Sequence, residues 1–175
     1  MKFKLDTFKM GYIILYKNEG NNLFGKGIIA KQLAAGFSAE AAQYTHAEVS
    51  GGSEFSVNIS PPVSKLINIT KTHKGRYVCL MRYKNDVYEA KGRYKVAYFS
   101  ATLANKMYDV KGILSFIFKW ITHDNRLYFC SEGAAWALQK EFPEAFNGRT
   151  PNKIMPADFL NLFIFEKVWE GRIGG

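Results

Sequence analysis

The chain is poor in cysteine, with only Cys79 and Cys130 among its 175 residues. Two cysteines are too few for a disulfide framework, and without a CxxC pair they do not indicate a zinc site. The sequence also lacks repeats, low-complexity segments and any linker rich in Pro, Gly or Ser. Together with a hydrophobic content of 47%, these absences predict a single domain over residues 1–175 with a sizeable core.

Long apolar runs are missing near the N-terminus as well. The run YIILY (12–16) follows several lysines and an aspartate, and it is far too short for the apolar region of a signal peptide or for a membrane span. We therefore expect no transmembrane segment and a cytoplasmic location, in which both thiols stay reduced.

The charge is unbalanced toward positive, because 24 Lys and Arg against 15 Asp and Glu give a formal net charge of +9. A basic surface can attract nucleic acid, anionic lipid or an anionic polymer. The basic residues are scattered, however, and they form no Arg/Lys-rich block interleaved with aromatic residues. The composition therefore favours a basic, solvated surface without a specific nucleic-acid motif.

Hydrophobic periodicity predicts an α+β domain that opens and closes with a strand. Strands are expected at 10–17, 45–52, 54–60, 75–83 and 163–170, with a hairpin turn at Gly51-Gly52. Helices are expected at 25–36, 87–107 and 131–142, with a shorter one from Met155. The helix at 131–142 has the clearest apolar stripe, formed by Ala134, Leu138 and Phe142, and Pro143 ends it.

The stretch RLYFCSEGAAWAL (126–138) places a cysteine where this helix begins. A thiol at a helix N-terminus lies in a positive potential that favours the thiolate, which is the nucleophilic form. Cys130 is therefore a candidate nucleophile, with packing as a small hydrophobic residue as the alternative. Cys79 lies in the middle of a predicted strand, and the pattern there favours a core position.

Three histidines could serve Cys130 as a base. His73 lies in the basic segment TKTHKGR, which favours a solvated loop. His123 precedes Asp124-Asn125, a turn signal that favours a surface position. His46 lies inside a predicted strand and is the strongest candidate, because a cysteine-protease-like site needs a histidine on a strand beside the cysteine's helix.

Six strings in one order carry a resemblance that spans nearly the whole chain: GYIILYK, YTHAEVSGG, VNISPPV, MYDVKGILSF, YFCSEGAAWAL and MPADFL. In this order the chain resembles the circularly permuted papain-like cysteine hydrolases. They belong to the wider NlpC-like superfamily, which also holds the lecithin:retinol acyltransferases. The resemblance implies a permuted papain-like fold, with an antiparallel sheet packed against helices and the nucleophile helix beside the sheet.

The resemblance also implies roles for individual residues. Cys130 matches the nucleophile and His46 matches the general base. Asn58 stands where the family usually has a carboxylate, so it is the first choice for the third member. Glu48 is the second choice, because it lies two residues after His46 on a strand and shares its face. Tyr44, beside the histidine, is a candidate wall of the substrate cleft, with core packing as the alternative.

The implied activity is that of a thiol-dependent hydrolase or acyltransferase without a cofactor or metal. It would cleave an amide, isopeptide or ester bond of a small-molecule, peptide or lipid substrate through a thioester. The alternative is a catalytically idle binding module with a basic surface for lipid, cell-wall polymer or nucleic acid, and the loss of the carboxylate at Asn58 favours it. Glu132, in the first helical turn, and Asp109 are expected to be structural.

Overall fold

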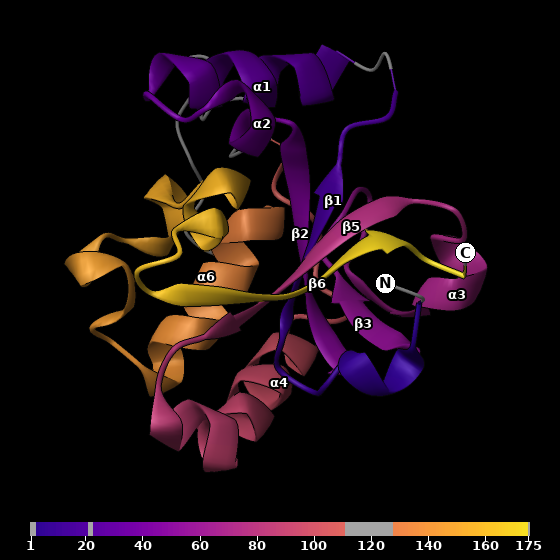
Figure 1. Cartoon of the computed structure of the whole chain (residues 1–175), viewed down its shortest axis with the longest axis vertical. Helices are drawn as coiled ribbons and strands as arrows, with labels where there is room; N and C mark the ends of the chain where they lie inside the picture. Colours follow the sequence, from indigo (N-terminus) through magenta and orange to yellow (C-terminus); the bar gives the residue numbers. More distant parts are fainter. Residues whose placement is uncertain (1–2, 21–22, 111–127, 175) are drawn as a thin grey trace.

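The computed structural model describes residues 3–20, 23–110 and 128–174, and within them the fold is α+β. One six-stranded antiparallel sheet has the order β4-β3-β2-β1-β5-β6 (Figure 1). Its strands are β1 (Ile13–Lys17), β2 (Tyr44–Gly52), β3 (Phe55–Asn58), β4 (Lys65–Asn68), β5 (Tyr77–Tyr83) and β6 (Phe165–Arg172). The five predicted strands are confirmed, and β4 is an additional edge strand.

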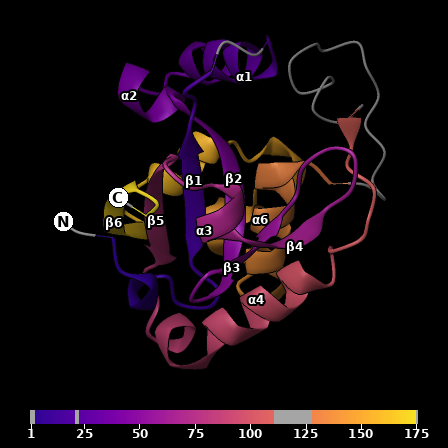
Figure 2. The ribbon, with the colours of Figure 1, turned by 90° about the vertical axis from the view of Figure 1, so that its right-hand side faces the viewer.

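Helices surround the sheet. They are α1 (Leu23–Ala34), α2 (Ala39–Ala42), α3 (Ile69–Thr72), the π-helical turn η2 (Tyr88–Gly92), α4 (Arg93–Ala101) and α6 (Cys130–Glu141). Short 3-10 turns are η1 (Leu5–Thr7), η3 (Ala145–Gly148), η4 (Pro151–Lys153) and η5 (Pro156–Leu160). Helices α6 and α3 lie on opposite sides of the sheet, and α1 and α2 lie together at one end of it (Figures 1 and 2).

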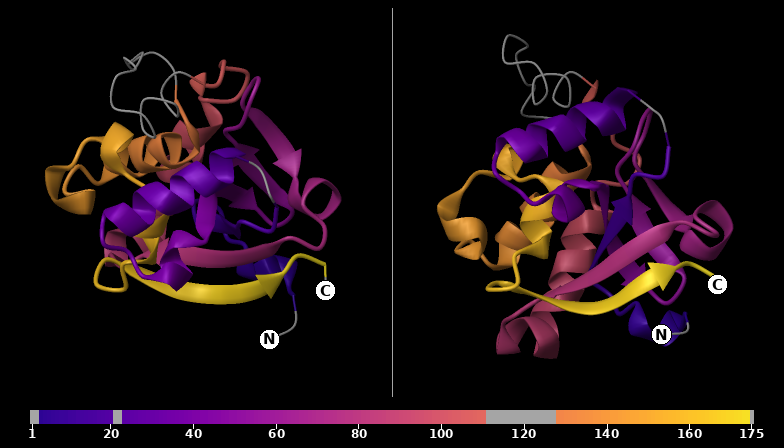
Figure 3. Two further views of the ribbon diagram at one scale, coloured as in Figure 1. Left: turned by 90° about the horizontal axis from the view of Figure 1, so that it is seen from above. Right: turned by 45° about the horizontal axis from the view of Figure 1, so that its top comes forward.

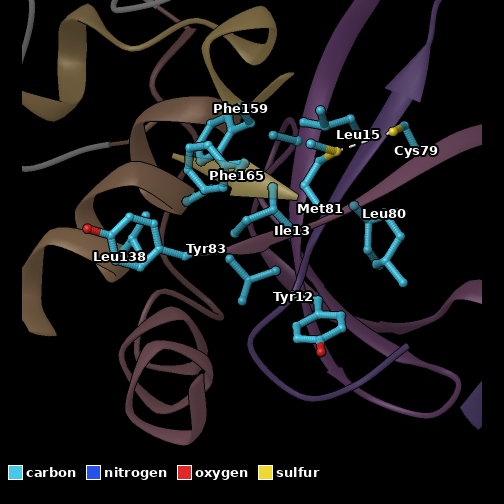
Figure 4. Close-up of a cluster of buried hydrophobic side chains, with 14 of the residues drawn as sticks. Tyr12, Ile13, Leu15, Cys79, Leu80, Met81, Tyr83, Leu138, Phe159 and Phe165 are labelled. Carbon is cyan, nitrogen blue, oxygen red and sulfur yellow. Dashed lines mark hydrogen bonds between the residues drawn. The ribbon is translucent and has the colours of Figure 1, made fainter. Parts of the chain in front are cut away.

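The main core lies between α6 and the central strands. Figure 4 shows side chains of β1 and β5 meeting Leu138 of α6 and two phenylalanines from the C-terminal part of the chain. The predicted apolar stripe is confirmed, because Ala134 and Leu138 of α6 and Phe142, which directly follows the helix, are all buried. Each large apolar side chain buried in this way contributes about 1.5–3 kcal/mol to folding. Helix α6 is thereby held firmly against β2, with its first residue at the edge of the core.

The two ends of the described chain also meet. Figure 3 shows the N-terminal segment beside the last part of β6. There the ring of Phe3 packs edge-on against Trp169, with centroids 5.7 Å apart. This contact covers one face of β6, which is an edge strand of the sheet.

Helix α1 is tied to the sheet by a buried glutamine. The side-chain amide of Gln32 donates to the carbonyl oxygens of Ala42 at 2.9 Å and Tyr44 at 3.0 Å, and its oxygen accepts from the N–H of Ala157 at 2.8 Å. Because every polar atom of this amide is bonded, its burial carries no unpaired group. Leu33, its sequence neighbour, is by contrast exposed.

Most predicted boundaries differ from the structure by one to three residues, and two differences are of another kind. The hairpin turn falls at Ser53-Glu54, because Gly51 and Gly52 still belong to β2, and Gly52 and Ser53 both have positive φ values, of 96° and 51°. The helix predicted over 87–107 ends at Ala101. None of the helices in the described ranges has both the length and the apolar composition that crossing a bilayer requires.

Candidate active site

Cys130 is the first residue of α6, as the sequence predicts. Phe129 precedes it in an extended conformation, and its N–H donates to the carboxyl group of Glu132 at 3.3 Å, which fixes the start of the helix. Gly133 allows α6 to lie close to the sheet, since a Cβ at this position would come within 2.2 Å of the Ile59 side chain. The thiol of Cys130 is therefore held on a packed helix, and the residue is only 3% exposed.

A β-bulge in β2 sets the direction of His46. In the register of β1 and β2, Tyr16 pairs with His46 and Lys17 pairs with Tyr44, so Thr45 is the extra residue. An extra residue breaks the alternation of side chains along a strand. Tyr44 and His46 consequently face opposite sides of the sheet.

The bulge turns Tyr44 away from the cavity that His46 lines, so the structure favours the alternative of core packing over a cleft wall. Its ring is buried, and its hydroxyl donates to the carboxylate of Glu170 at 2.5 Å. Tyr44 lines a separate cavity together with Cys79 and Glu170. The residues of one strand do not decide between these two roles for Tyr44, because a bulge depends on how two strands pair.

His46 and Cys130 line one cavity of about 230 Å³, and each shifts the pKa of the other. Burial acts to raise the pKa of Cys130, but the His46 ring and the backbone N–H groups of Ala47 and Ser131 lower it below its usual value. Burial acts to lower the pKa of His46, but the negative charges of Cys130 and Glu48 raise it to about 10. Both shifts favour a thiolate–imidazolium pair.

The ring of His46 is held through Nε2. This nitrogen lies 3.2 Å from Oε1 of Glu48 and 3.2 Å from Oδ1 of Asn58. Both candidates for the third member therefore reach the same nitrogen, which donates its hydrogen to these oxygen acceptors. Nδ1 is consequently the nitrogen that remains for the thiol of Cys130.

Glu48 is fully buried and has more partners than the sequence indicates. Its Oε2 accepts hydrogen bonds from the hydroxyl groups of Tyr16 at 2.8 Å and Ser56 at 2.5 Å. Its Oε1 accepts from Nε2 of His73 at 2.9 Å, in addition to His46. Burial acts to raise the pKa of this carboxyl group, but the hydrogen bonds and charges of the two histidines lower it to about 2.

The expectation of a solvated His73 is wrong. Its side chain is only 13% exposed, and its ring packs on Tyr16 with centroids 4.6 Å apart. His73 follows the short helix α3, which begins where the side chain of Asn68 accepts from the N–H of Lys71 at 3.1 Å. This turn brings a basic, polar segment back over the sheet, a long-range effect that its composition does not predict. His123 lies outside the described residues.

The rest of the cavity is partly apolar and partly polar. Its apolar wall comes from α1 and from the loop after β3, and includes Phe24, Ile28 and Pro61. Asn18, Arg76 and Tyr108 add polar groups that the sequence reasoning did not identify. The guanidinium of Arg76 donates to the carbonyl oxygen of Lys17 at 3.1 Å. Burial, and then the charge of Cys130, raise the pKa of Tyr108 well above its usual value, so its hydroxyl stays protonated.

Glu132 and Asp109 are both buried close to the start of α6. Burial raises the pKa of Glu132 to about 8, against the hydrogen bond from Phe129, and the charge of Asp109 adds to this rise. Glu132 is therefore largely protonated near neutral pH. The hydrogen bond to Phe129 gives it the structural role that its position predicts.

Within the part of the chain that the structure describes, no group of three or more His, Cys, Asp or Glu side chains is arranged to hold a metal ion. Comparison of the chain with protein-family models gave no match, and comparison with curated proteins gave none either.

Proposed function

We propose that the protein is a thiol-dependent hydrolase or acyltransferase of the permuted papain-like class, with Cys130 as nucleophile and His46 as general base. One observation carries the proposal: a cysteine at the first position of a helix lines the same cavity as a strand histidine. Glu48 and Asn58, which both bind the other ring nitrogen, are proposed to orient the imidazole together.

The reaction follows from this arrangement. Nδ1 of His46 takes the thiol proton, and the Cys130 thiolate attacks the carbonyl carbon of an amide or ester. Backbone N–H groups in the first turn of α6 stabilise the oxyanion of the tetrahedral intermediate. As that intermediate collapses, the His46 imidazolium gives its proton to the leaving nitrogen or oxygen, and a thioester remains on Cys130.

Water or another acceptor then resolves the thioester. His46, neutral again, removes a proton from the incoming hydroxyl or amine, and the thiolate leaves as the new acyl bond forms. The apolar wall at Phe24 and Ile28 suits the acyl part of a substrate, and the Asn18 side chain can bind a polar group beside the carbonyl. These features fit an acyl group from a peptide, a lipid or a small molecule.

Alkylation of the native protein tests the proposal, with Cys79 as an internal control. Iodoacetamide at pH 7 should modify Cys130 at least about tenfold faster than Cys79, because a larger share of Cys130 is thiolate and the cavity gives access to it. Peptide mass spectrometry over time gives both rates. A second sample, treated with an activated thioester, should gain one acyl group on Cys130. Equal rates at the two cysteines would contradict the proposal.

A further inference from the structure

We propose that His73 is a positioning residue that acts on His46 through Glu48. His73 and His46 both donate to Oε1 of Glu48. The hydrogen bond from His73 therefore weakens the stabilisation that this oxygen gives to the His46 imidazolium. The inference rests on the proposed function, because it assigns His73 a role in the protonation of the Cys130–His46 pair. It is supported by geometry that the sequence does not indicate.

The carboxylate of Glu48 is saturated with donors. Two hydroxyl groups, from Tyr16 and Ser56, bind Oε2, and two imidazole nitrogens, from His46 and His73, bind Oε1. A carboxylate oxygen accepts about two hydrogen bonds through its lone pairs. The two donors therefore fill both sites of Oε1 and share the negative charge of one oxygen.

Of these two donors, His73 is the closer. Its Nε2 lies 2.9 Å from Oε1, against 3.2 Å for Nε2 of His46. Both nitrogens must carry hydrogen to donate, so the shared oxygen fixes both rings with Nε2–H. For His46 this leaves Nδ1 to exchange a proton with Cys130.

Removing the N–H donor of residue 73 should strengthen the hydrogen bond between Nε2 of His46 and Oε1 of Glu48. The hydroxyl groups of Tyr16 and Ser56 would still fix Oε2, so the carboxylate would keep its place while Oε1 served His46 alone. The His46 imidazolium would then be favoured, and with it the Cys130 thiolate. The other charged or titratable groups that face this cluster, Arg76 and Tyr16, are unchanged by the substitution.

Two variants of the full chain separate donation from packing. His73→Phe keeps a ring against Tyr16 but has no N–H, whereas His73→Gln keeps an N–H at a similar distance from the backbone. The rate of Cys130 alkylation by iodoacetamide is measured against pH. In His73→Phe the apparent pKa of the Cys130 thiol, taken from this profile, should fall by about half to one unit. A change of this size is the effect of one hydrogen bond of ordinary strength. His73→Gln should restore the wild-type profile.

The outcomes distinguish the two proposals. If Cys130 reacts selectively but both variants follow the wild-type profile, the role of His73 is refuted and the proposed function stands. The same shift in both variants would also refute it, because packing or the ring itself would then be the cause. If Cys130 does not react faster than Cys79 in the wild type, the proposed function itself fails. Thermal unfolding of each variant checks that the alkylation profiles come from folded protein.

Discussion

The two cysteines are similarly buried, but their pKa values are shifted in opposite directions. Cys79 in β5 and Cys130 in α6 are 0% and 3% exposed. The thiol of Cys79 lies 3.4 Å from the sulfur of Met81 (Figure 4), and burial, with the charge of Glu170, raises its pKa to about 12. Cys130 is subject to the same desolvation, yet its pKa is lowered. Burial alone therefore does not decide the direction in which the pKa of a cysteine shifts.

The difference comes from the partners of the two sulfurs. Cys130 has a helix N-terminus, two backbone N–H groups and the His46 ring, all of which favour a negative sulfur. Cys79 has apolar neighbours and nearby carboxylates, which disfavour it. The ratio of the two alkylation rates is thus a direct measure of what each partner contributes, and substitutions of those partners should change it by predictable amounts.

The largest change is expected for His46→Ala. Without the imidazolium, the Cys130 thiol loses its main stabilising charge, and its pKa should return toward the ordinary value near 9. The thiolate share at pH 7 would then be about 1%, so alkylation of Cys130 should slow by about 10- to 100-fold. The rate at Cys79 provides the control in the same sample. If Cys130 kept its rate, the base role of His46 would be excluded.

A smaller change is expected for Glu48→Gln. The neutral amide removes the charge that stabilises the His46 imidazolium, and hydrogen bonds to charged groups contribute about 1.5–3 kcal/mol. Alkylation of Cys130 at neutral pH should slow by about tenfold or more, with the Cys79 rate unchanged. An unaltered rate would mean that the charge of Glu48 does not stabilise the His46 imidazolium, and that Asn58 alone orients the ring.

The same variant should alter the pH dependence of stability. The pKa of Glu48 is lowered from 4.5 to about 2 in the folded protein. Its contribution is therefore fully present above pH 4.5 and is lost as the pH falls toward 2, because the unfolded state binds the proton first. Urea unfolding of the wild type should show this loss between those pH values. In Glu48→Gln this component of the pH dependence should be absent.

Some of the site follows from local sequence. The start of α6 at Cys130 is predictable because aromatic residues, a small-residue helix and an acidic residue in its first turn lie within one short stretch. The strand positions of His46 and Glu48 also follow, since alternation alone places them on one face. These features depend on residues close together in the chain.

Other features depend on pairing between distant segments. The bulge at Thr45 arises from the match between β1 and β2, and it separates Tyr44 from His46. The packing of His73 on Tyr16 depends on the return of α3 over the sheet, so a basic loop composition gives the wrong prediction for it. The buried Gln32 is a third case, because its partners come from two separate segments, at residues 42–44 and at Ala157.

The smallest change is expected for Asn58, the first choice for the third member from sequence. Its oxygen lies as far from Nε2 of His46 as that of Glu48 does, at 3.2 Å, but it carries no charge. One neutral hydrogen bond contributes about 1 kcal/mol, so Asn58→Ala should slow Cys130 alkylation by about fivefold. The measurement is again the ratio of the two cysteine rates.

Asn58→Asp sharpens the same comparison. From sequence alone, a carboxylate at this position is expected to preserve or raise activity, because it would supply the charge that Asn lacks. The structure already has that charge in Glu48, and two carboxylates on one nitrogen repel each other. We therefore expect no gain over the wild type in the rate at Cys130. A clear rise in this rate would mean that Glu48 stabilises His73 more than His46. Residue 58 would then be the main residue that orients the base.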